Sequence, residues 1–145
     1  MKIKHNNKEY DAVSFIMKKE NAIAILKGEK NVEIRNFSDF YCNMLLDKEI
    51  VNKNLKNKDD YECPMKEVNF IHFHDYNNSF YLDCAVGGQG IGRLDKETVK
   101  MLNEDYNFHD FDEDVEKYDN FSEEDIPPFF YFEVKALNTN IIINN

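Results

Sequence analysis

Residues 68–86 of the chain read VNFIHFHDYNNSFYLDCAV. Two runs rich in aromatic and β-branched residues flank a polar turn, and this pattern predicts a β-hairpin with strands at 68–74 and 80–86. Side chains alternate between the two faces of a strand, so His72 and His74 are expected on the same face. We take this hairpin as the central element of the fold.

On the N-terminal side of the hairpin, residues 1–35 predict a β-meander, because four short runs with β-branched or aromatic residues are separated by plausible turns. The expected strands are Lys2–His5, Lys8–Met17, Ala22–Lys27 and Val32–Arg35. Ser38 can cap the helix that follows. Apolar residues such as Phe40 and Met44 recur close to helical spacing, which predicts a helix over residues 39–55.

On the C-terminal side, Asp95 can cap a short helix that runs through Val99. Two prolines precede a predicted strand at 129–136, and a turn is expected to lead from it into the apolar run at 141–143, giving a C-terminal hairpin. This order of elements favours an α+β fold with a mainly antiparallel sheet and two or so helices. No repeat or boundary interrupts the chain, so residues 1–145 are expected to form a single domain.

The composition is that of a soluble globular protein, with 145 residues, 42% hydrophobic and 32% charged. A chain of this size can stabilise a core without a disulfide or a structural metal. The cysteines are Cys42, Cys63 and Cys84; their odd number and wide spacing indicate reduced thiols in a cytoplasmic protein. No apolar stretch approaches the length of about eighteen residues that a membrane span needs, so neither secretion nor membrane insertion is expected.

Negative charge is concentrated in one segment. The net charge is −10, and residues 104–125 contain eleven acids and a single lysine, whereas the rest of the chain has equal numbers of acidic and basic residues. Such a segment repels phosphate backbones and attracts basic surfaces. Direct binding of nucleic acid is therefore disfavoured.

The same segment is rich in aromatic residues, which a purely solvated acidic tail lacks. A docking surface uses aromatic rings as anchors and charges for steering. The candidate partner-binding residues are the acids Asp110, Asp112, Glu113, Asp114 and Glu116 and the rings of Phe108, Phe111 and Tyr118. The alternative is that the rings hold an acidic loop or helix against the sheet while the charges remain in water. The sequence alone leaves both open.

These features predict a non-catalytic acidic binding or inhibitor protein. Its carboxylates would take the positions of phosphates, and its rings those of bases, on a basic surface of a nuclease or another nucleic-acid-binding protein. In size and charge the chain is similar to phage-encoded anti-defence inhibitors and to immunity proteins. A basic protein partner is expected, with no direct nucleic acid, no membrane and no cofactor.

A second hypothesis rests on the glycine-rich stretch that follows the predicted hairpin. A glycine-rich turn before a helix can present backbone N–H groups to phosphate. Residues 89–94 resemble the Q/R-x-x-G-x-G/A pyrophosphate loop of GNAT-type acetyltransferases, with Gln89 and Gly92 in matching positions and Leu94 in place of the last Gly or Ala. The resemblance implies an acyltransferase that binds coenzyme A through Gly88, Gly90, Gly92 and Arg93. The alternative is a structural role for glycine in a turn or a bulged strand end.

A third hypothesis is a metal site. His72 and His74 could present two imidazoles to one ion, and His109, Asp110 or Asp75 could complete a tetrahedral set. A metal held in this way could make a bound water nucleophilic. The alternative is a pair of solvated or packed histidines on one face of a hairpin, and no metal is assigned.

Overall fold

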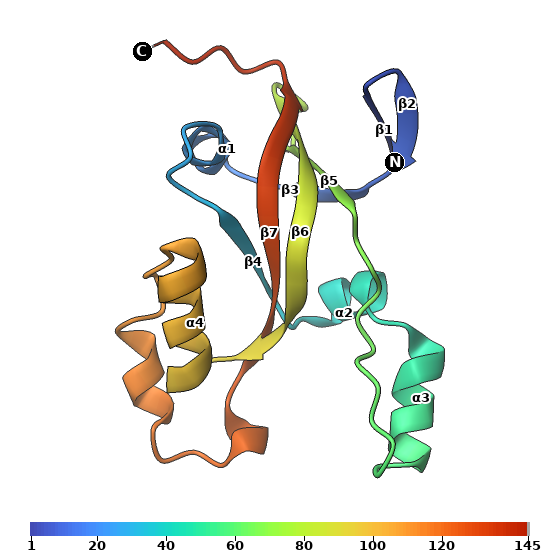
Figure 1. The fold of residues 1–145 in the computed structure, drawn as a ribbon, viewed down its shortest axis with the longest axis vertical. Coiled ribbons are helices and arrows are strands. Elements are labelled where there is room, and N and C mark those ends of the chain that lie inside the picture. Colours follow the sequence, from blue (N-terminus) through green and yellow to red (C-terminus); the bar gives the residue numbers. More distant parts are fainter. Residues whose placement is uncertain (145) are drawn as a thin grey trace.

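The computed structural model describes residues 1–144, and within them the chain forms seven strands, four α-helices and two 3-10 helices (Figure 1). In chain order these are β1 (Lys2–His5), β2 (Lys8–Asp11), β3 (Val13–Ile16), α1 (Lys19–Leu26), β4 (Val32–Asn36), α2 (Asp39–Leu45), α3 (Lys48–Lys56), β5 (Phe70–His74), β6 (Tyr81–Arg93), α4 (Lys96–Tyr106), η1 (Asp114–Tyr118), η2 (Glu123–Asp125) and β7 (Pro128–Thr139). The α+β class and the mainly antiparallel sheet that the sequence predicts are confirmed.

Five strands form the main sheet in the order β3-β5-β6-β7-β4, and β1 and β2 form a separate antiparallel hairpin. All neighbours in the main sheet are antiparallel except β3 and β5, which are parallel. β3 and β4 follow each other in the chain but lie at opposite edges of the sheet, joined by α1 (Figure 1). The chain therefore crosses the sheet between them.

The expected N-terminal meander is correct in its first hairpin and in its last strand, which is β4, but the strand expected at 8–17 is divided into β2 and β3 and the strand expected at 22–27 is wrong. Residues 22–27 lie mostly in α1, which buries Ala22 and Ile25 against the core. These two residues are three apart, as one face of a helix requires, and alanine favours the helix. The isoleucines of this stretch suggested a strand from the sequence, but packing of one helical face against the sheet decides the structure.

The helix predicted over residues 39–55 is two helices. Ser38 caps α2 as expected, but Leu46 is extended and bridges to Met65, and Asp47 caps α3 by accepting hydrogen bonds from the backbone N–H groups of Glu49 and Ile50. A side chain that accepts hydrogen bonds from the backbone N–H groups two or three residues ahead marks the start of a helix. α3 is therefore a separate helix and not a continuation of α2. Figure 1 shows α3 standing apart from the sheet, and α3 has no buried residue.

The central hairpin is confirmed as β5 and β6, and β6 continues through the glycine-rich stretch to Arg93. The predicted C-terminal turn and the strand at 141–143 are wrong. β7 continues to Thr139, where Asn138 and Thr139 pair with the start of β6, and the chain has no strand at 141–143. β6 is long enough to pair with β7 over nearly the whole length of β7.

Two hydrophobic cores share β7. Along this strand Phe130 and Phe132 enter the main core with residues of β3, β5, α1 and α2, whereas Phe129 enters a second core with α4 and the segment after it. Alternate residues of a strand face opposite sides of the sheet, which explains the division. We call residues 96–126, from the start of α4 to the residue after η2, the acidic lobe.

All three cysteines are free thiols. Cys84 lies in the main core, where burial raises the pKa of its thiol to about 12. This cysteine therefore stays protonated and acts as a small apolar side chain.

Candidate functional site

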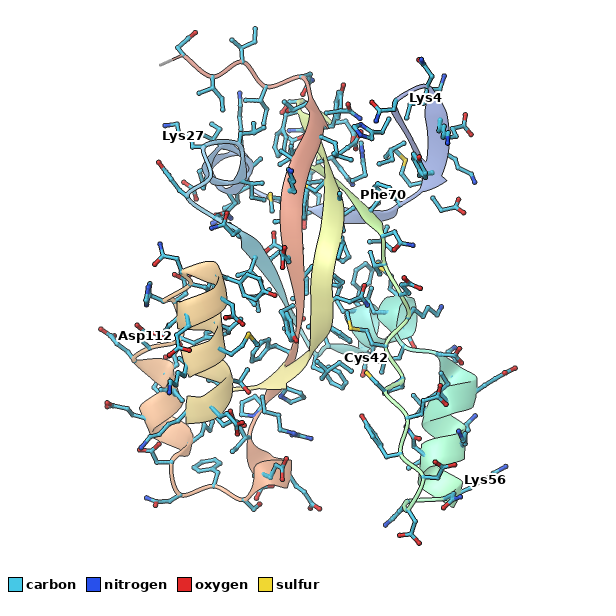
Figure 2. All side chains as sticks on the ribbon, viewed as in Figure 1. Lys4, Lys27, Cys42, Lys56, Phe70 and Asp112 are labelled. Atoms are coloured by element: carbon cyan, nitrogen blue, oxygen red, sulfur yellow. The ribbon has the colours of Figure 1, made fainter. Side chains whose placement is uncertain are left out.

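The predicted partner-binding acids all lie on the acidic lobe. Asp110, Asp112, Glu113 and Glu116 are exposed and Asp114 is partly buried. Figure 2 shows Asp112 on the side of the lobe that faces away from the sheet. Asp114 pairs with Lys117 at 3.1 Å, and across residues 1–144 Asp110, Glu113 and Glu116 take part in no ion pair. Most of the negative charge is thus presented to the solvent.

Asp112 also has a structural role. Its carboxylate accepts a hydrogen bond of 2.8 Å from Asn103 of α4 and lies 3.1 Å from Nδ1 of His109. The hydrogen bond from Asn103 lowers the pKa of the Asp112 carboxyl, and His109 lowers it to a lesser extent. This carboxylate therefore ties the turn at the end of α4 to the helix itself.

The rings expected to anchor a partner are partly buried within the lobe. Phe108, Phe111 and Tyr118 pack against the second core, and the ring of Phe111 lies 5.2 Å from that of Phe129 on β7. These contacts hold the acidic segment against the sheet. A role of the three rings in docking stays a prediction. Phe121, which is 50% exposed and stacks edge-on with Tyr118, presents the most open aromatic surface of the lobe.

The glycine-rich stretch does not form the predicted loop. Gly90 and Gly92 lie within β6, opposite Tyr131 and Phe129 of β7, after a bulge between Val86 and Gln89. A Cβ atom on Gly90 would lie 2.6 Å from the hydroxyl oxygen of Tyr131. Glycine is needed here because aromatic rings cross the strand, so the alternative of structural glycine in a bulged strand is confirmed.

The other residues of this predicted site hold the fold together. The side chain of Gln89 accepts a hydrogen bond from the backbone N–H of Val68 and donates one to the carbonyl of Lys66, both at 2.8 Å. Arg93 donates to the carbonyl of Ile126 at 2.8 Å, which joins β6 to the acidic lobe. The expectation of a pyrophosphate loop is wrong, and the coenzyme A site stays a prediction without the loop that suggested it.

His72 and His74 do share one face of β5, with ring centroids 5.6 Å apart. The proposed additional ligands do not approach them: His109 pairs with Asp112 in the acidic lobe, and the carboxylate of Asp75 accepts hydrogen bonds from Ser79. Among residues 1–144, no group of three or more His, Cys, Asp or Glu side chains is placed to hold a metal ion. The completed tetrahedral site is therefore wrong.

Each histidine has its own polar partner. Nδ1 of His72 lies 2.6 Å from a carboxylate oxygen of Asp83, and these side chains are only 14% and 8% exposed. His74 lies between the carbonyl oxygen of Asp75, 2.8 Å from Nδ1, and the hydroxyl of Ser14, 2.9 Å from Nε2. The two rings are therefore held in fixed orientations.

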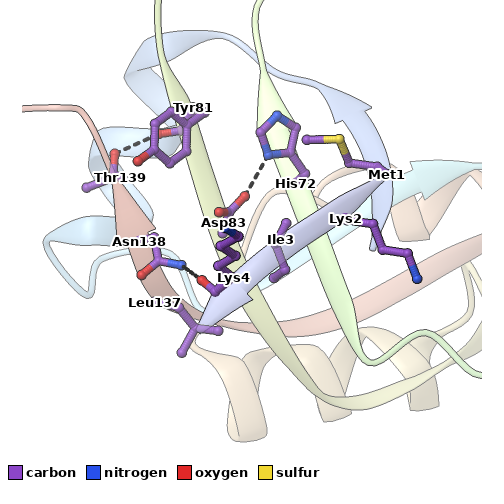
Figure 3. Close-up of a pocket in the computed structure, with 10 residues that line it drawn as sticks. All are labelled: Met1, Lys2, Ile3, Lys4, His72, Tyr81, Asp83, Leu137, Asn138 and Thr139. Atoms are coloured by element: carbon purple, nitrogen blue, oxygen red, sulfur yellow. Dashed lines mark hydrogen bonds and ion pairs between the residues drawn. The ribbon is translucent and has the colours of Figure 1, made fainter. Parts of the chain in front are cut away.

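These residues belong to a polar row that crosses four strands. Ser14 on β3 pairs in register with His72 on β5, His72 with Asp83 on β6, and Asp83 with Asn138 on β7. A cavity of about 650 Å³ lies beside this row and is lined in part by β1 and the end of β7. Figure 3 draws its lining residues. Asn138 donates to the carbonyl of Lys4 at 2.6 Å, which fixes the β1–β2 hairpin over this part of the sheet.

The sequence interpretation missed Ser14 and Asp83. Asp83 could have been found, because the register of a hairpin follows from its turn, and that register places Asp83 opposite His72. No local signal places Ser14 beside His74, since β3 and β5 are far apart in the chain and pair in parallel.

Comparison of the chain with protein-family models, with curated proteins and with solved structures gave no match. Across residues 1–144, none of the helices combines the length and the apolar character that crossing a bilayer requires.

Proposed function

We propose that this chain is an acidic binding protein whose lobe occupies a basic, nucleic-acid-binding surface of a partner protein by charge mimicry. The observation that supports this most directly is the arrangement of the acids: they lie on the outside of a folded lobe, and Asp110, Glu113 and Glu116 form no ion pair among the described residues. A cationic partner supplies what these carboxylates lack within the chain.

The folded state of the lobe also favours this function. Its second core, which includes Leu102 and Val115, holds the acidic turns against the sheet before any partner arrives. A surface that is already ordered loses less conformational freedom on binding than a disordered acidic tail. The concentrated charge would speed the encounter with a basic surface, and salt would weaken this effect.

The aromatic contact in this proposal comes mainly from Phe121, with the partly exposed edge of Tyr118. The two rings border a hollow of about 350 Å³ that Glu97, Asp119 and Lys96 also line, and Lys96 pairs with Asp119 at 3.4 Å. A guanidinium group entering this hollow would meet the two rings and Glu97, and would compete with Lys96 for Asp119.

The test is a pull-down from a lysate with the chain immobilised, washed at low and at high salt, followed by identification of the retained proteins. The lobe variant carries Asp110→Asn, Glu113→Gln and Glu116→Gln. The matched control carries Glu9→Gln, Asp60→Asn and Glu67→Gln, which removes the same charge from exposed acids outside the lobe. We expect a nucleic-acid-binding protein that the control retains and the lobe variant loses. Equal retention by both variants would contradict the proposal.

A further inference from the structure

The contact between Ser14 and His74 has a defined direction. Nδ1 of His74 lies 2.8 Å from the carbonyl oxygen of Asp75, and a carbonyl only accepts hydrogen bonds, so Nδ1 carries the proton. Nε2 is then the acceptor, and the Ser14 hydroxyl 2.9 Å away donates to it. The backbone carbonyl of Asp75, just after β5, thus fixes the tautomer in which His74 can remove a proton from Ser14.

A hydroxyl beside an imidazole that is itself oriented by a third group is the arrangement of an activated serine. We propose that Ser14 and His74 are a nucleophile and base that transfer the acyl group of small esters to water. This inference goes beyond the proposed docking function and does not depend on it, because no residue of the acidic lobe takes part.

The surroundings of Ser14 favour a small ester with an apolar group. Ser14 and His74 line a hollow of about 460 Å³, a volume within the usual range for small-molecule sites, and most of the remaining lining is aromatic or aliphatic. Phe40 and Tyr76 at its rim are 65% and 84% exposed. These rings, with Ile16, can cover the apolar part of a substrate while its carbonyl group faces Ser14.

The outer edge of β3 offers backbone N–H groups to the developing oxyanion. β3 is an edge strand, and the backbone N–H of Met17 donates to His74 on the neighbouring strand. Because successive residues of a strand alternate in direction, the N–H groups of Ser14 and Ile16 face away from β5. The carbonyl of Ile16 accepts a hydrogen bond from Arg35 on that outer side, which agrees with this direction. Backbone N–H groups of this kind stabilise the negative oxygen of a tetrahedral intermediate.

The reaction requires only the ester and water. Nε2 of His74 takes the hydroxyl proton as Oγ of Ser14 forms a bond to the acyl carbon; the bond from that carbon to the alcohol oxygen then breaks, and the alcohol leaves with the proton from His74. Water next attacks the acyl-serine and gives one proton to Nε2, the bond between the acyl carbon and Oγ breaks, and Oγ recovers its proton. The products are one carboxylic acid and one alcohol.

The experiment treats the full chain with a fluorophosphonate probe, which reacts with activated serines with loss of fluoride, and maps the adduct by peptide mass spectrometry. Hydrolysis of p-nitrophenyl butyrate is followed in parallel. We expect an adduct at Ser14 in the unchanged protein, and no adduct at that position and no hydrolysis above background in Ser14→Ala. His74→Gln should slow both reactions by about 10²- to 10⁴-fold, the usual contribution of a general base.

The matched control is His109→Gln, which makes the same substitution at an exposed histidine that pairs with Asp112 in the acidic lobe. Its labelling rate should stay within about twofold of the unchanged protein, because His109 has no contact with Ser14 or His74. Thermal melting of each variant shows whether a lower labelling rate comes from loss of the base or from loss of the fold. Mapping the adduct in the unchanged protein tests the proposal without any variant. Absence of an adduct at Ser14, or equal labelling rates in folded His74→Gln and the unchanged protein, would overturn the proposal.

Discussion

The main core and the second core are built on opposite faces of β7, and they differ in the number of side chains that they bury. Among the described residues, the main core contains fourteen buried side chains and the second core seven. Four phenylalanines of the main core are fully buried, whereas most of the aromatic rings of the lobe are only partly buried. Units with fewer buried contacts open at lower free energy, so the sheet is expected to set the global stability and the lobe to open first.

The two proposed activities lie on different units of the molecule. The proposed docking surface lies on the acidic lobe, whose core has fewer buried side chains and whose carboxylates repel one another. Ser14 and His74 lie on the sheet, within hydrogen-bonded strands. A loss of lobe structure should therefore abolish the proposed docking and leave Ser14 in contact with His74.

The largest expected effect comes from Phe132→Ala in the main core. Phe132 is fully buried and packs on Phe15, so its removal leaves a cavity and should lower the free energy of unfolding by about 3–5 kcal/mol. Denaturant unfolding measures this, with Phe121→Ala on the lobe as the control that should change stability by less than about 0.5 kcal/mol. Similar losses from both variants would break the distinction between the two units.

Gly90→Ala is expected to have the next largest effect. The added methyl group would meet the ring of Tyr131, and such overpacking costs about 1–3 kcal/mol. The same denaturant titration in the presence and absence of coenzyme A measures the loss and tests the acyltransferase hypothesis. A stability equal to that of the unchanged protein would show that Tyr131 moves aside freely. A higher stability in the presence of coenzyme A would support the coenzyme A site that the resemblance implied.

Asp95→Ala tests the lobe directly. The Asp95 carboxylate accepts a hydrogen bond from the N–H of Thr98 at 2.8 Å and caps α4, and loss of such a cap costs about 1 kcal/mol. Hydrogen exchange should show faster exchange in α4 and little change in β5 and β6. Ser38→Ala, which removes the longer cap of α2 at 3.4 Å, is the control and should leave the lobe unchanged. Equal loss of protection across the sheet would show that lobe and sheet open together.

The smallest expected effect is the pH dependence contributed by Asp112. Its pKa is lowered in the folded protein, so its contribution to stability is present above the unfolded value of about 3.9 and is lost as the pH falls through the lower folded value. Asp112→Asn keeps an acceptor for Asn103 and removes the charge, and should reduce the acid sensitivity of exchange in the lobe. Glu113→Gln is the control without such a bond, and identical acid profiles for all three proteins would contradict the assignment.

Local patterns carried much of the prediction. Alternation around a polar turn identified the β5–β6 hairpin, and the caps at Ser38 and Asp95 placed the starts of α2 and α4 correctly. The errors arose where long-range packing competes with local preference. Residues 22–26 belong to a helix because the sheet offers a surface for Ala22 and Ile25. The glycines of β6 stay extended because aromatic residues of β7 pair with them and cover them.

The sequence by itself determined the α+β class, the central hairpin and the segment that carries the charge, because residue type, alternation and capping act over a few neighbouring positions. Only the tertiary structure decided that β3 pairs in parallel with β5, that Ser14 lies beside His74, and that the rings of the acidic segment turn toward a core of their own. These contacts join residues far apart in the chain, and they depend on the packing of the whole sheet.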